Sequence, residues 1–405
     1  MKLIFLNRYF HPDVSATSQM LSSLAFHLAA EGAEVHVVTS RQCYDNPSAG
    51  LPSRQEIAGV RVHRVRTSGF GRGSLPGRAL DYASFYVSAT IGLAKLVRRG
   101  DIVISKTDPP VISFPASVLA HARGARLANW LQDLFPEIAE RVGVRLLHTG
   151  GLARAARDFS LRNAALNVVI GERMRMRVQS IPGVAPVRVI HNWADGTRIV
   201  PIPREDNPAR EAWGLSGKFV VSYSGNMGRA HEFETVLDSA SALRGNEGVV
   251  FLFIGGGHHY HRLQDESRNR GLPNVRFQPY QPLEGLGASL CAGDVHLITP
   301  APSMEGLVVP SKLYGILAAG RPAINVGDPS GEVAGILEAA KAGFTVPTGN
   351  PVLLTQRILE CASNPALCAN LGRNARLTFE QHFSEKIAFA RWKEALLAVD
   401  QGALG

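Results

Sequence analysis

Cysteines and long apolar runs are both scarce in this sequence. Four cysteines occur among 405 residues, and their spacing fits no metal or redox motif. We therefore expect reduced thiols, as in a cytoplasmic protein, rather than a disulfide framework. The most apolar helix-like segment, residues 82–97, contains Lys95 and several hydroxyl residues. It is shorter than the roughly 20 residues that cross a bilayer, so we interpret it as a core helix, with contact to a membrane surface as the alternative.

Several familiar signals are also absent near the start of the sequence. The apolar stretch Leu3–Leu6 runs directly into Asn7 and Arg8, so it is too short for a signal-peptide core and predicts a buried first strand. The following loop, His11–Ser18, is rich in small hydroxyl residues but contains no G-x-G-x-x-G dinucleotide fingerprint. Its hydroxyls could cap a helix or hold an anion or a sugar.

Positive charge is concentrated in the first half of the chain. Residues 1–200 carry 25 Lys and Arg against 14 Asp and Glu, whereas residues 201–405 carry 18 against 20. Nucleic acid, an anionic membrane surface or a phosphorylated acceptor could explain this basic half. No helix-turn-helix, RNA-binding or zinc-finger signature is present, so nucleic acid is the least favoured partner.

Short apolar segments alternate with amphipathic ones along the whole sequence. This alternation predicts an α/β protein in which helices cover mostly parallel sheets. The chain is long enough for two such domains, and the Pro-rich segment 201–208 reads as their linker. We predict an N-terminal domain over 1–198, a C-terminal domain over 209–380, and a terminal amphipathic segment, 381–405, that packs back on the N-terminal domain.

The segment from Met304 to Pro322 carries the strongest candidate chemistry. A loop with Glu305 leads into a short predicted helix, which Ser311 could cap and in which Lys312 is the first charged residue. Backbone N–H groups, the helix dipole and an ammonium group together favour a phosphate. The alternative is an ordinary surface lysine after a turn.

Glycine-rich loops follow two predicted strands of the C-terminal domain. Strand, glycine-rich loop and helix recur there, as in nucleotide-binding α/β domains. Small residues let a ligand approach the backbone, and cationic side chains can face its phosphates. With the Lys312 segment, the predicted nucleotide-binding residues are Gly225, Asn226, Arg229, His231, Gly255, Gly256, Gln278, Pro310, Ser311 and Lys312.

A carboxylate stands at the end of a predicted strand in the N-terminal half. Residues 127–131 read as a strand, and Asp133 follows it. Ligands of open α/β sheets bind beyond the carboxyl ends of the strands. Asp133 is therefore a catalytic candidate beside Glu305 and Lys312, although a lone carboxylate at such a place is commonly a helix cap.

Taken together, these motifs resemble the family 4 glycosyltransferases, and most closely those of the colanic-acid and O-antigen type. The resemblance covers nearly the whole chain, from the His11-Pro-Asp loop through His191-Asn-Trp to Pro310-Ser-Lys and the terminal segment. It implies the GT-B fold, in which two Rossmann-like domains face each other across a cleft. It also implies a metal-independent, retaining enzyme that holds a nucleotide-sugar, often a UDP-sugar, in its C-terminal domain and the acceptor in its N-terminal domain.

Two positions depart from the pattern of that family. Its second glutamate corresponds to Gly315 here, so any contact that it makes to ribose must come from elsewhere. Its basic residues after the first C-domain glycine fall near Asn226 and His231. We therefore assign phosphate binding to Lys312 and Arg229, and a place near the donor sugar to Glu305.

The resulting expectation is a glycosyltransferase of bacterial surface polysaccharide synthesis. It would use a nucleotide-sugar as co-substrate, no cofactor and no metal, and would pass the sugar to a polyprenyl-diphosphate-linked or saccharide acceptor at the inner face of the cytoplasmic membrane. A nucleotide-sugar 2-epimerase of the same fold and a noncatalytic nucleotide-sugar-binding subunit remain the alternatives. Acceptor-dependent release of UDP would separate the three.

Overall fold

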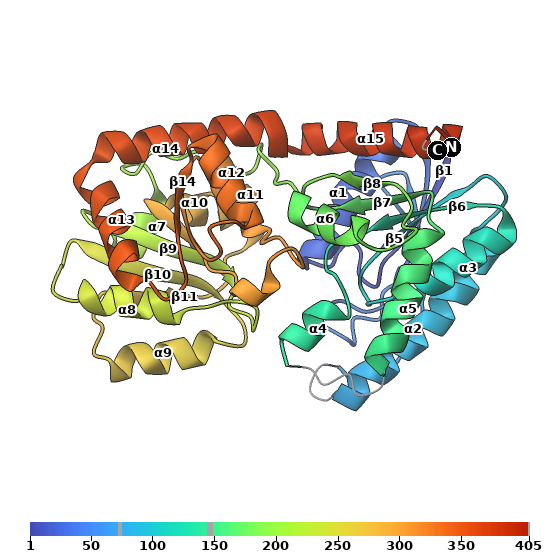
Figure 1. Ribbon diagram of the computed structural model, residues 1–405, viewed down its shortest axis with the longest axis horizontal. Helices are drawn as coiled ribbons and strands as arrows, with labels where there is room; N and C mark the ends of the chain where they lie inside the picture. The colour runs from blue at the N-terminus through green and yellow to red at the C-terminus, as the bar shows by residue number, and fades with distance from the viewer. Residues whose placement is uncertain (72–74, 144–148, 404–405) are drawn as a thin grey trace. The chain divides into compact units, whose positions relative to one another are not determined.

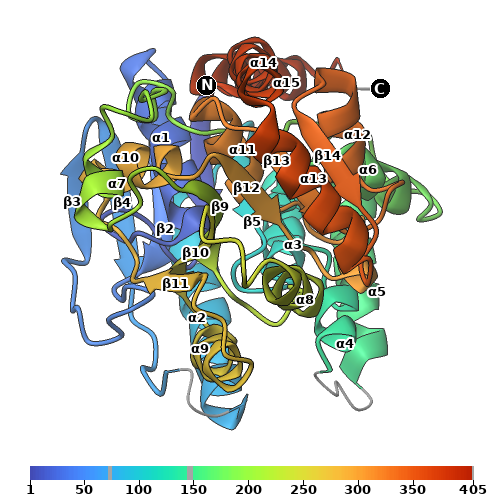
Figure 2. The same ribbon diagram turned by 90° about the vertical axis from the view of Figure 1, so that its left-hand side faces the viewer.

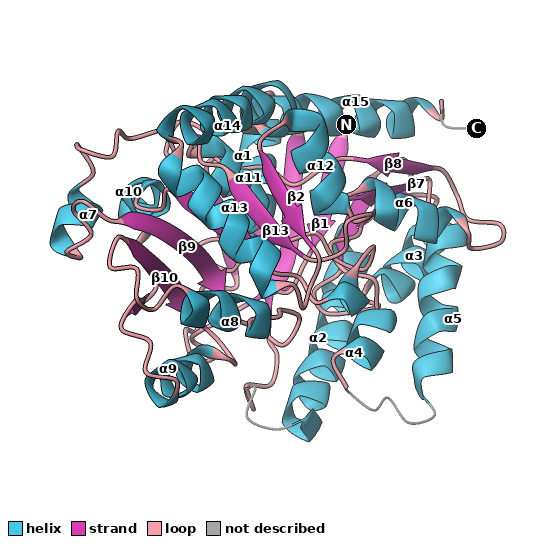
Figure 3. Cartoon of the chain, turned by 60° about the vertical axis from the view of Figure 1, so that its left-hand side comes forward, coloured by secondary structure: helices cyan, strands magenta, loops and turns pink. Residues whose placement is uncertain are grey.

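The computed structural model describes residues 1–71, 75–143 and 149–403. Within them the chain divides into two compact units, one formed by residues 1–191 with 389–405 and the other by residues 192–388. Residues 192–208, which the sequence analysis assigned to the end of the first domain and to the linker, thus belong to the second unit. Each unit contains both strands and helices (Figure 3).

The first unit is built on a sheet whose described strands follow the order β3-β4-β2-β1-β5-β6-β7-β8. All neighbours are parallel except β3 and β4, which are antiparallel. Its elements are β1 (Lys2–Leu6), α1 (Ala16–Ala30), β2 (Glu34–Ser40), β3 (Arg54–Ile57), β4 (Val60–Val65), α2 (Leu75–Leu96), β5 (Ile102–Lys106), α3 (Ser113–Arg123), β6 (Arg126–Trp130), α4 (Glu137–Arg141), α5 (Thr149–Arg162), β7 (Leu166–Val169), α6 (Glu172–Gln179) and β8 (Val187–Val189).

The second unit contains a parallel sheet in the order β11-β10-β9-β12-β13-β14, in which α13 packs against β13 and β14 (Figure 2). Its elements are α7 (Pro208–Ala212), β9 (Phe219–Asn226), α8 (Glu234–Ala242), β10 (Val249–Gly256), α9 (Tyr260–Asn269), β11 (Val275–Gln278), α10 (Leu286–Cys291), β12 (Val295–Ile298), α11 (Lys312–Ala318), β13 (Ala323–Val326), α12 (Glu332–Ala340), β14 (Gly343–Val346), α13 (Pro351–Ser363) and α14 (Pro365–Thr378).

Local sequence explains where several helices begin and end. The helices α13 and α14 each start with a proline, and the side chains of Asn350 and Asn364 accept a hydrogen bond from the first turn, from Leu353 N and Leu367 N, both at 3.0 Å. Such caps satisfy N–H groups that have no partner within the helix. Gly124, with φ +66, ends α3.

The last helix, α15 (Glu385–Gln401), begins in the second unit and continues in the first (Figure 1). In the first unit it lies beside α1, where Phe389 stacks on His27 and Lys393 pairs with Glu31 at 2.8 Å. Its buried Trp392 packs against Trp130 at the end of β6. These contacts fix the terminal helix to the first unit.

Helix α2 is longer and less uniformly buried than the sequence suggests. Predicted from residue 82, it begins at Leu75, while residues 72–74 lie outside the described part of the chain. Phe85, Ala89 and Leu93 are buried in the core, as expected for a core helix. Among the described residues, no helix has both the length and the apolar character needed to cross a membrane.

Candidate functional site

The candidate site lies at the carboxyl ends of β9, β10 and β12 in the second unit. From β9 the chain adds β10 and β11 on one side of the sheet, and then β12, β13 and β14 on the other. The order therefore reverses between β9 and β12. Open α/β sheets bind ligands at such a switch point, outside the carboxyl ends of the strands.

The loop after β9 is fixed against the end of β10. Gly225 pairs with Gly255 and Asn226 with Gly256, and the N–H of Met227 donates to the carbonyl of Gly256 at 2.7 Å. A Cβ on Gly255 would lie 2.3 Å from the carbonyl oxygen of Gly225. The sequence analysis explained these glycines by the approach of a ligand, but the close approach of the two strands already requires Gly255.

Gly255 should therefore not tolerate a side chain. Its φ is +132, so alanine would be strained as well as crowded. We expect Gly255→Ala to lower the free energy of unfolding by about 2 kcal/mol or more. The control Gly245→Ala, at a glycine with no atom within 4 Å of an added Cβ, should change it by less than about 0.5 kcal/mol. Urea unfolding measures both, and equal stability of the two variants would contradict this packing.

Lys312, the first residue of α11, turns its ammonium group towards this loop. The Nζ lies 3.4 Å from the centroid of the Tyr223 ring, and a Cβ added to Gly225 would lie 3.8 Å from the Nζ. The Nζ is buried, and no described residue offers it a hydrogen-bond partner. Burial holds the pKa of Lys312 well below its usual range. A buried cation of this kind is costly unless an anion compensates it.

His231 also lies beside Tyr223 and is uncharged. Its ring is 5.9 Å from the Tyr223 ring, and its Nδ1 is 3.3 Å from the carbonyl oxygen of Thr299, which follows β12. Burial, with a smaller effect of the Lys312 charge, lowers the pKa of His231 to about 3. The imidazole can therefore contribute a hydrogen bond to a ligand, but not a positive charge.

Glu305 is held by the start of α12. Its Oε1 accepts a hydrogen bond from the backbone N–H of Glu332 at 2.8 Å, and a Cβ on Gly331 would lie 2.4 Å from its Oε2. Burial raises the pKa of Glu305, and the nearby carboxylates of Glu332 and Asp328 add to this effect. The helix N-terminus thus orients a half-buried carboxylate in the loop that leads to Lys312.

Other predicted residues surround this centre less closely. Ser311 precedes α11, but its backbone is already helical (φ −61, ψ −22) and its side chain makes no capping hydrogen bond, so the predicted cap is wrong. The carbonyl oxygen of Pro310 accepts a hydrogen bond from the backbone N–H of Leu313 at 3.2 Å. Gln278 is the last residue of β11, and Arg229 is exposed in the loop after β9.

Gly315 and Asp133 have surroundings of a different kind. A Cβ on Gly315 would meet Leu290 at 3.3 Å and Ile199 at 3.9 Å, so this position faces apolar side chains. Asp133 belongs to the first unit, near Lys106, whose Nζ donates to the carbonyl of Thr17 at 3.0 Å. Burial raises the pKa of Asp133 to about 6 and lowers that of Lys106 to about 7.

Three contributors to this site escaped the sequence analysis. Tyr223 supplies the ring under the Lys312 ammonium, and Glu332 supplies the N–H that holds Glu305. The exposed ring of Tyr280 lies against Gly256, 3.0 Å from the position of an added Cβ. Tyr223 lies within β9 at the end of a largely apolar run and reads as core, while the N-terminus of α12 becomes relevant only through the fold.

No group of His, Cys, Asp and Glu side chains within the described residues has the arrangement of a metal site. The arrangement around Lys312 offers a buried cation, an oriented carboxylate and a neutral imidazole around one switch point. Such a set can bind an anionic group and act on the part of the ligand next to it.

Comparison with known proteins gives the family. The sequence model of the glycosyl transferase 4-like domain matches residues 16–193, and that of the glycosyl transferases group 1 matches residues 205–378. "Probable glycosyltransferase WbjE" of Pseudomonas aeruginosa is 30% identical over 319 residues, 78% of each chain. "Putative colanic acid biosynthesis glycosyl transferase WcaI" of Escherichia coli K12 is 31% identical over 339 residues, 80% of this chain and 83% of that one.

Solved structures share the fold over the whole chain. Sucrose-phosphate synthase from Thermosynechococcus elongatus has a TM-score of 0.80 at 15% identity, and covers 98% of this chain and 99% of its own. HepE of Anabaena, solved in complex with UDP-glucose, has a TM-score of 0.73 at 16% identity, and covers 98% and 100%. The predicted GT-B fold class, with two parallel-sheet α/β domains, is confirmed. The chain is therefore a member of the group 1 glycosyltransferases, with a glycosyl transferase 4-like domain in its N-terminal half.

Proposed function

We propose that this glycosyltransferase moves a sugar from a UDP-sugar to a saccharide or lipid-linked acceptor in the synthesis of a bacterial surface polysaccharide, with retention of configuration and without a metal. The observation that carries the donor assignment is the Lys312 ammonium, which is buried without a partner at the switch point of the second sheet. A diphosphate placed there would supply the missing anion.

The proposed chemistry follows from the charges that develop during transfer. The sugar becomes positive and the departing diphosphate becomes more negative, so groups that stabilise the diphosphate lower the barrier. Lys312 would act on the leaving group, with the exposed Arg229 as a second cation. Glu305 would orient the donor sugar and favour its positive charge.

Relatives support the substrate class. WcaI carries colanic acid biosynthesis in its name, and HepE, which shares the fold, was solved with UDP-glucose. The test is acceptor-dependent release of UDP by the purified chain with a panel of UDP-sugars. Release only with acceptor supports transfer. A free epimerised sugar without acceptor would favour the epimerase, and nucleotide binding without turnover would favour a noncatalytic subunit.

Activity should survive chelation of divalent metals. If Lys312 stabilises the diphosphate, the task that a metal performs in other transferases is already filled. Transfer measured with EDTA present should stay within about twofold of the untreated rate, because charged contacts in the site are unchanged. Loss of activity in EDTA with recovery on addition of magnesium or manganese would overturn the proposed role of Lys312.

A face of α2 supports the proposed place at the inner membrane surface. Leu80, Val87 and Ile91 are 55%, 62% and 54% exposed and recur at spacings that put them on one side of the helix. Lys95 and Arg99, at the end of the helix and just after it, are exposed as well. Apolar side chains flanked by cations suit the interface of an anionic bilayer.

The full chain should therefore co-sediment with vesicles that contain anionic lipid, and less so as salt rises. Each Lys or Arg near the surface contributes about 1 kcal/mol, and salt screens this attraction. Val87→Asp should weaken binding, because it places a negative charge on the apolar face. Val352→Asp, at a 67% exposed position of α13, should not. No binding to anionic vesicles at low salt would reject membrane association.

A further inference from the structure

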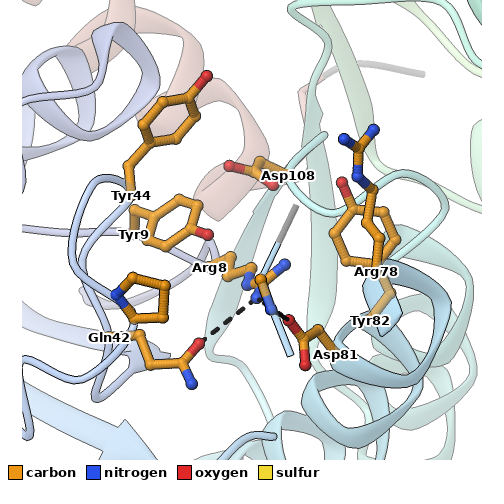
Figure 4. Close-up of a pocket in the computed structure, with 10 residues that line it drawn as sticks. Arg8, Tyr9, Gln42, Tyr44, Arg78, Asp81, Tyr82 and Asp108 are labelled. Carbon is orange, nitrogen blue, oxygen red and sulfur yellow. Dashed lines mark hydrogen bonds and ion pairs between the residues drawn. The ribbon is translucent and has the colours of Figure 1, made fainter. Parts of the chain in front are cut away.

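The first unit contains a polar pocket of about 270 Å3 that the proposed donor chemistry does not use (Figure 4). Its walls come from the segments that follow β1, β2 and β5 and from the beginning of α2. These three strands are neighbours in the order β2-β1-β5, where the sheet reverses its direction of growth. The pocket thus occupies the switch point of the first sheet, where open α/β sheets bind ligands.

Arg8 forms the floor of this pocket. Its guanidinium lies 5.3 Å from the ring of Tyr9 and 5.2 Å from that of Tyr82. Its Nη2 is 3.6 Å from Asp81 Oδ2 and donates a long hydrogen bond, 3.4 Å, to Gln42 Oε1. Arg8 is 6% exposed, and within the described part of the chain its Nε has no hydrogen-bond partner. A buried guanidinium is therefore well oriented but incompletely bonded.

Two carboxylates, Asp81 and Asp108, line the pocket, and Asp81, the one beside Arg8, is already occupied. Asp81 accepts hydrogen bonds from Ser68 Oγ at 2.8 Å, Phe70 N at 3.1 Å and Gly71 N at 3.0 Å. Asp81 thus holds the loop that ends at Gly71 and has little capacity left for Arg8. This explains why the separation from Arg8 remains 3.6 Å.

Arg78, on the first turns of α2, is the second cation of the pocket. Its Nε is buried and has no hydrogen-bond partner among the residues that the structure describes. In Figure 4 it rises beside Tyr82, while Tyr9 and Tyr44 stand on the other side of the pocket. Among the described residues that line the pocket, the buried side-chain atoms without a hydrogen-bond partner are thus guanidinium nitrogens. An acceptor group rich in oxygen would supply the hydrogen bonds that these two side chains lack.

The rings and the size of the pocket narrow the choice of ligand. Tyr9, Tyr44 and Tyr82 offer apolar faces with polar tips, a combination that suits the alternating C–H and O–H surfaces of a sugar. The volume lies just below the roughly 300 Å3 at which ligand pockets usually begin. One sugar ring fits such a space better than an oligosaccharide.

We propose that this pocket is an acceptor subsite that takes one sugar unit bearing an acidic group, a carboxylate or a phosphate, whose oxygens accept hydrogen bonds from Arg8 and Arg78. This inference rests on the proposed transferase function, because it names the acceptor of that reaction. The two guanidinium groups fix the acidic group, and the tyrosines pack against the ring. The alternative is that Arg8 and Arg78 serve only the fold, in which case the pocket would need no ligand.

The test is ligand-observed NMR of the full chain with glucuronic acid, glucose 6-phosphate, neutral glucose and inorganic phosphate. At least one acidic sugar should bind more tightly than both glucose and phosphate, and whichever acid binds identifies the group. Arg78→Gln should weaken that binding roughly tenfold or more, the effect of losing a charge-assisted hydrogen bond. Arg123→Gln, at an exposed arginine of α3, should leave it unchanged.

Four results would overturn the inference. If glucose bound as tightly as the acidic sugars, the pocket would not recognise an acidic group. If inorganic phosphate bound as tightly as the acidic sugars, the pocket would not recognise a sugar. Binding that Arg78→Gln leaves intact, or no binding of either acidic sugar, would reject the subsite itself. UDP binding is measured in the same samples. If the wild type binds UDP but neither acidic sugar, only the subsite is rejected. If the wild type does not bind UDP, the proposed function is rejected.

Discussion

Lys312→Met should lower the rate of sugar transfer by about a hundredfold or more, because losing one charged contact to the leaving group costs a few kcal/mol in the transition state. The same variant should be at least as stable as the wild type in the absence of ligand. Its side chain keeps most of the volume of lysine, but it no longer buries an ammonium without a partner. Loss of activity without loss of stability separates a functional lysine from a structural one.

The pH dependence of stability gives a second readout for Lys312. Because burial depresses its pKa in the folded state, the unfolded chain binds the proton more tightly. Below the folded-state pKa of Lys312, its buried charge therefore lowers the free energy of unfolding by the full amount. This effect fades as the pH rises towards the unfolded-state pKa near 10.4. The stability difference between Lys312→Met and the wild type should shrink as the pH rises. Lys218→Ala, which removes a lysine whose Nζ donates to the carbonyl of Glu247, should show neither this trend nor the loss of transfer.

Glu305→Gln should reduce transfer by a similar factor, about a hundredfold, through loss of the negative charge near the developing positive charge of the sugar. The amide oxygen can still accept from Glu332 N, so the fold and the loop should be retained. UDP should bind with nearly wild-type affinity, because Glu305 is assigned to the sugar and not to the nucleotide.

Glu338→Gln is the matched control for Glu305. Glu338 is an exposed residue of the same helix, α12, that holds Glu305, and its substitution should leave transfer intact. If Glu305→Gln weakened UDP and UDP-sugar equally, Glu305 would belong to the nucleotide. If it kept full activity, the carboxylate would serve only as a cap for α12.

Apolar periodicity and turn residues predicted most elements of this fold. The buried first strand predicted over Leu3–Leu6 falls within β1, and the strand predicted over 127–131 overlaps β6. The antiparallel strand β3 was missed, because its residues, Arg54–Ile57, are mostly polar and exposed and carry no alternating pattern. The start of α2 was missed because Pro76 and Gly77 read as loop residues.

The candidate site was predictable only where a residue has a chemical signature of its own. Lys312 and Glu305 stood out in the sequence as charged residues around a short helix. The charge state of His231 was not predictable, since it depends on burial that only the fold creates. The pocket around Arg8 was also missed, because its residues come from segments that the order of the strands brings together.

Binding of UDP and of uridine to the wild type and to Lys312→Met, measured by calorimetry, tests the central claim most directly. The account predicts that the wild type prefers UDP strongly and that Lys312→Met loses roughly tenfold or more of that preference, because only UDP carries phosphates for the ammonium to bind. Uridine itself should bind both proteins alike. If Lys312→Met kept the full preference for UDP over uridine, the phosphates would bind elsewhere and the account of this site would be wrong.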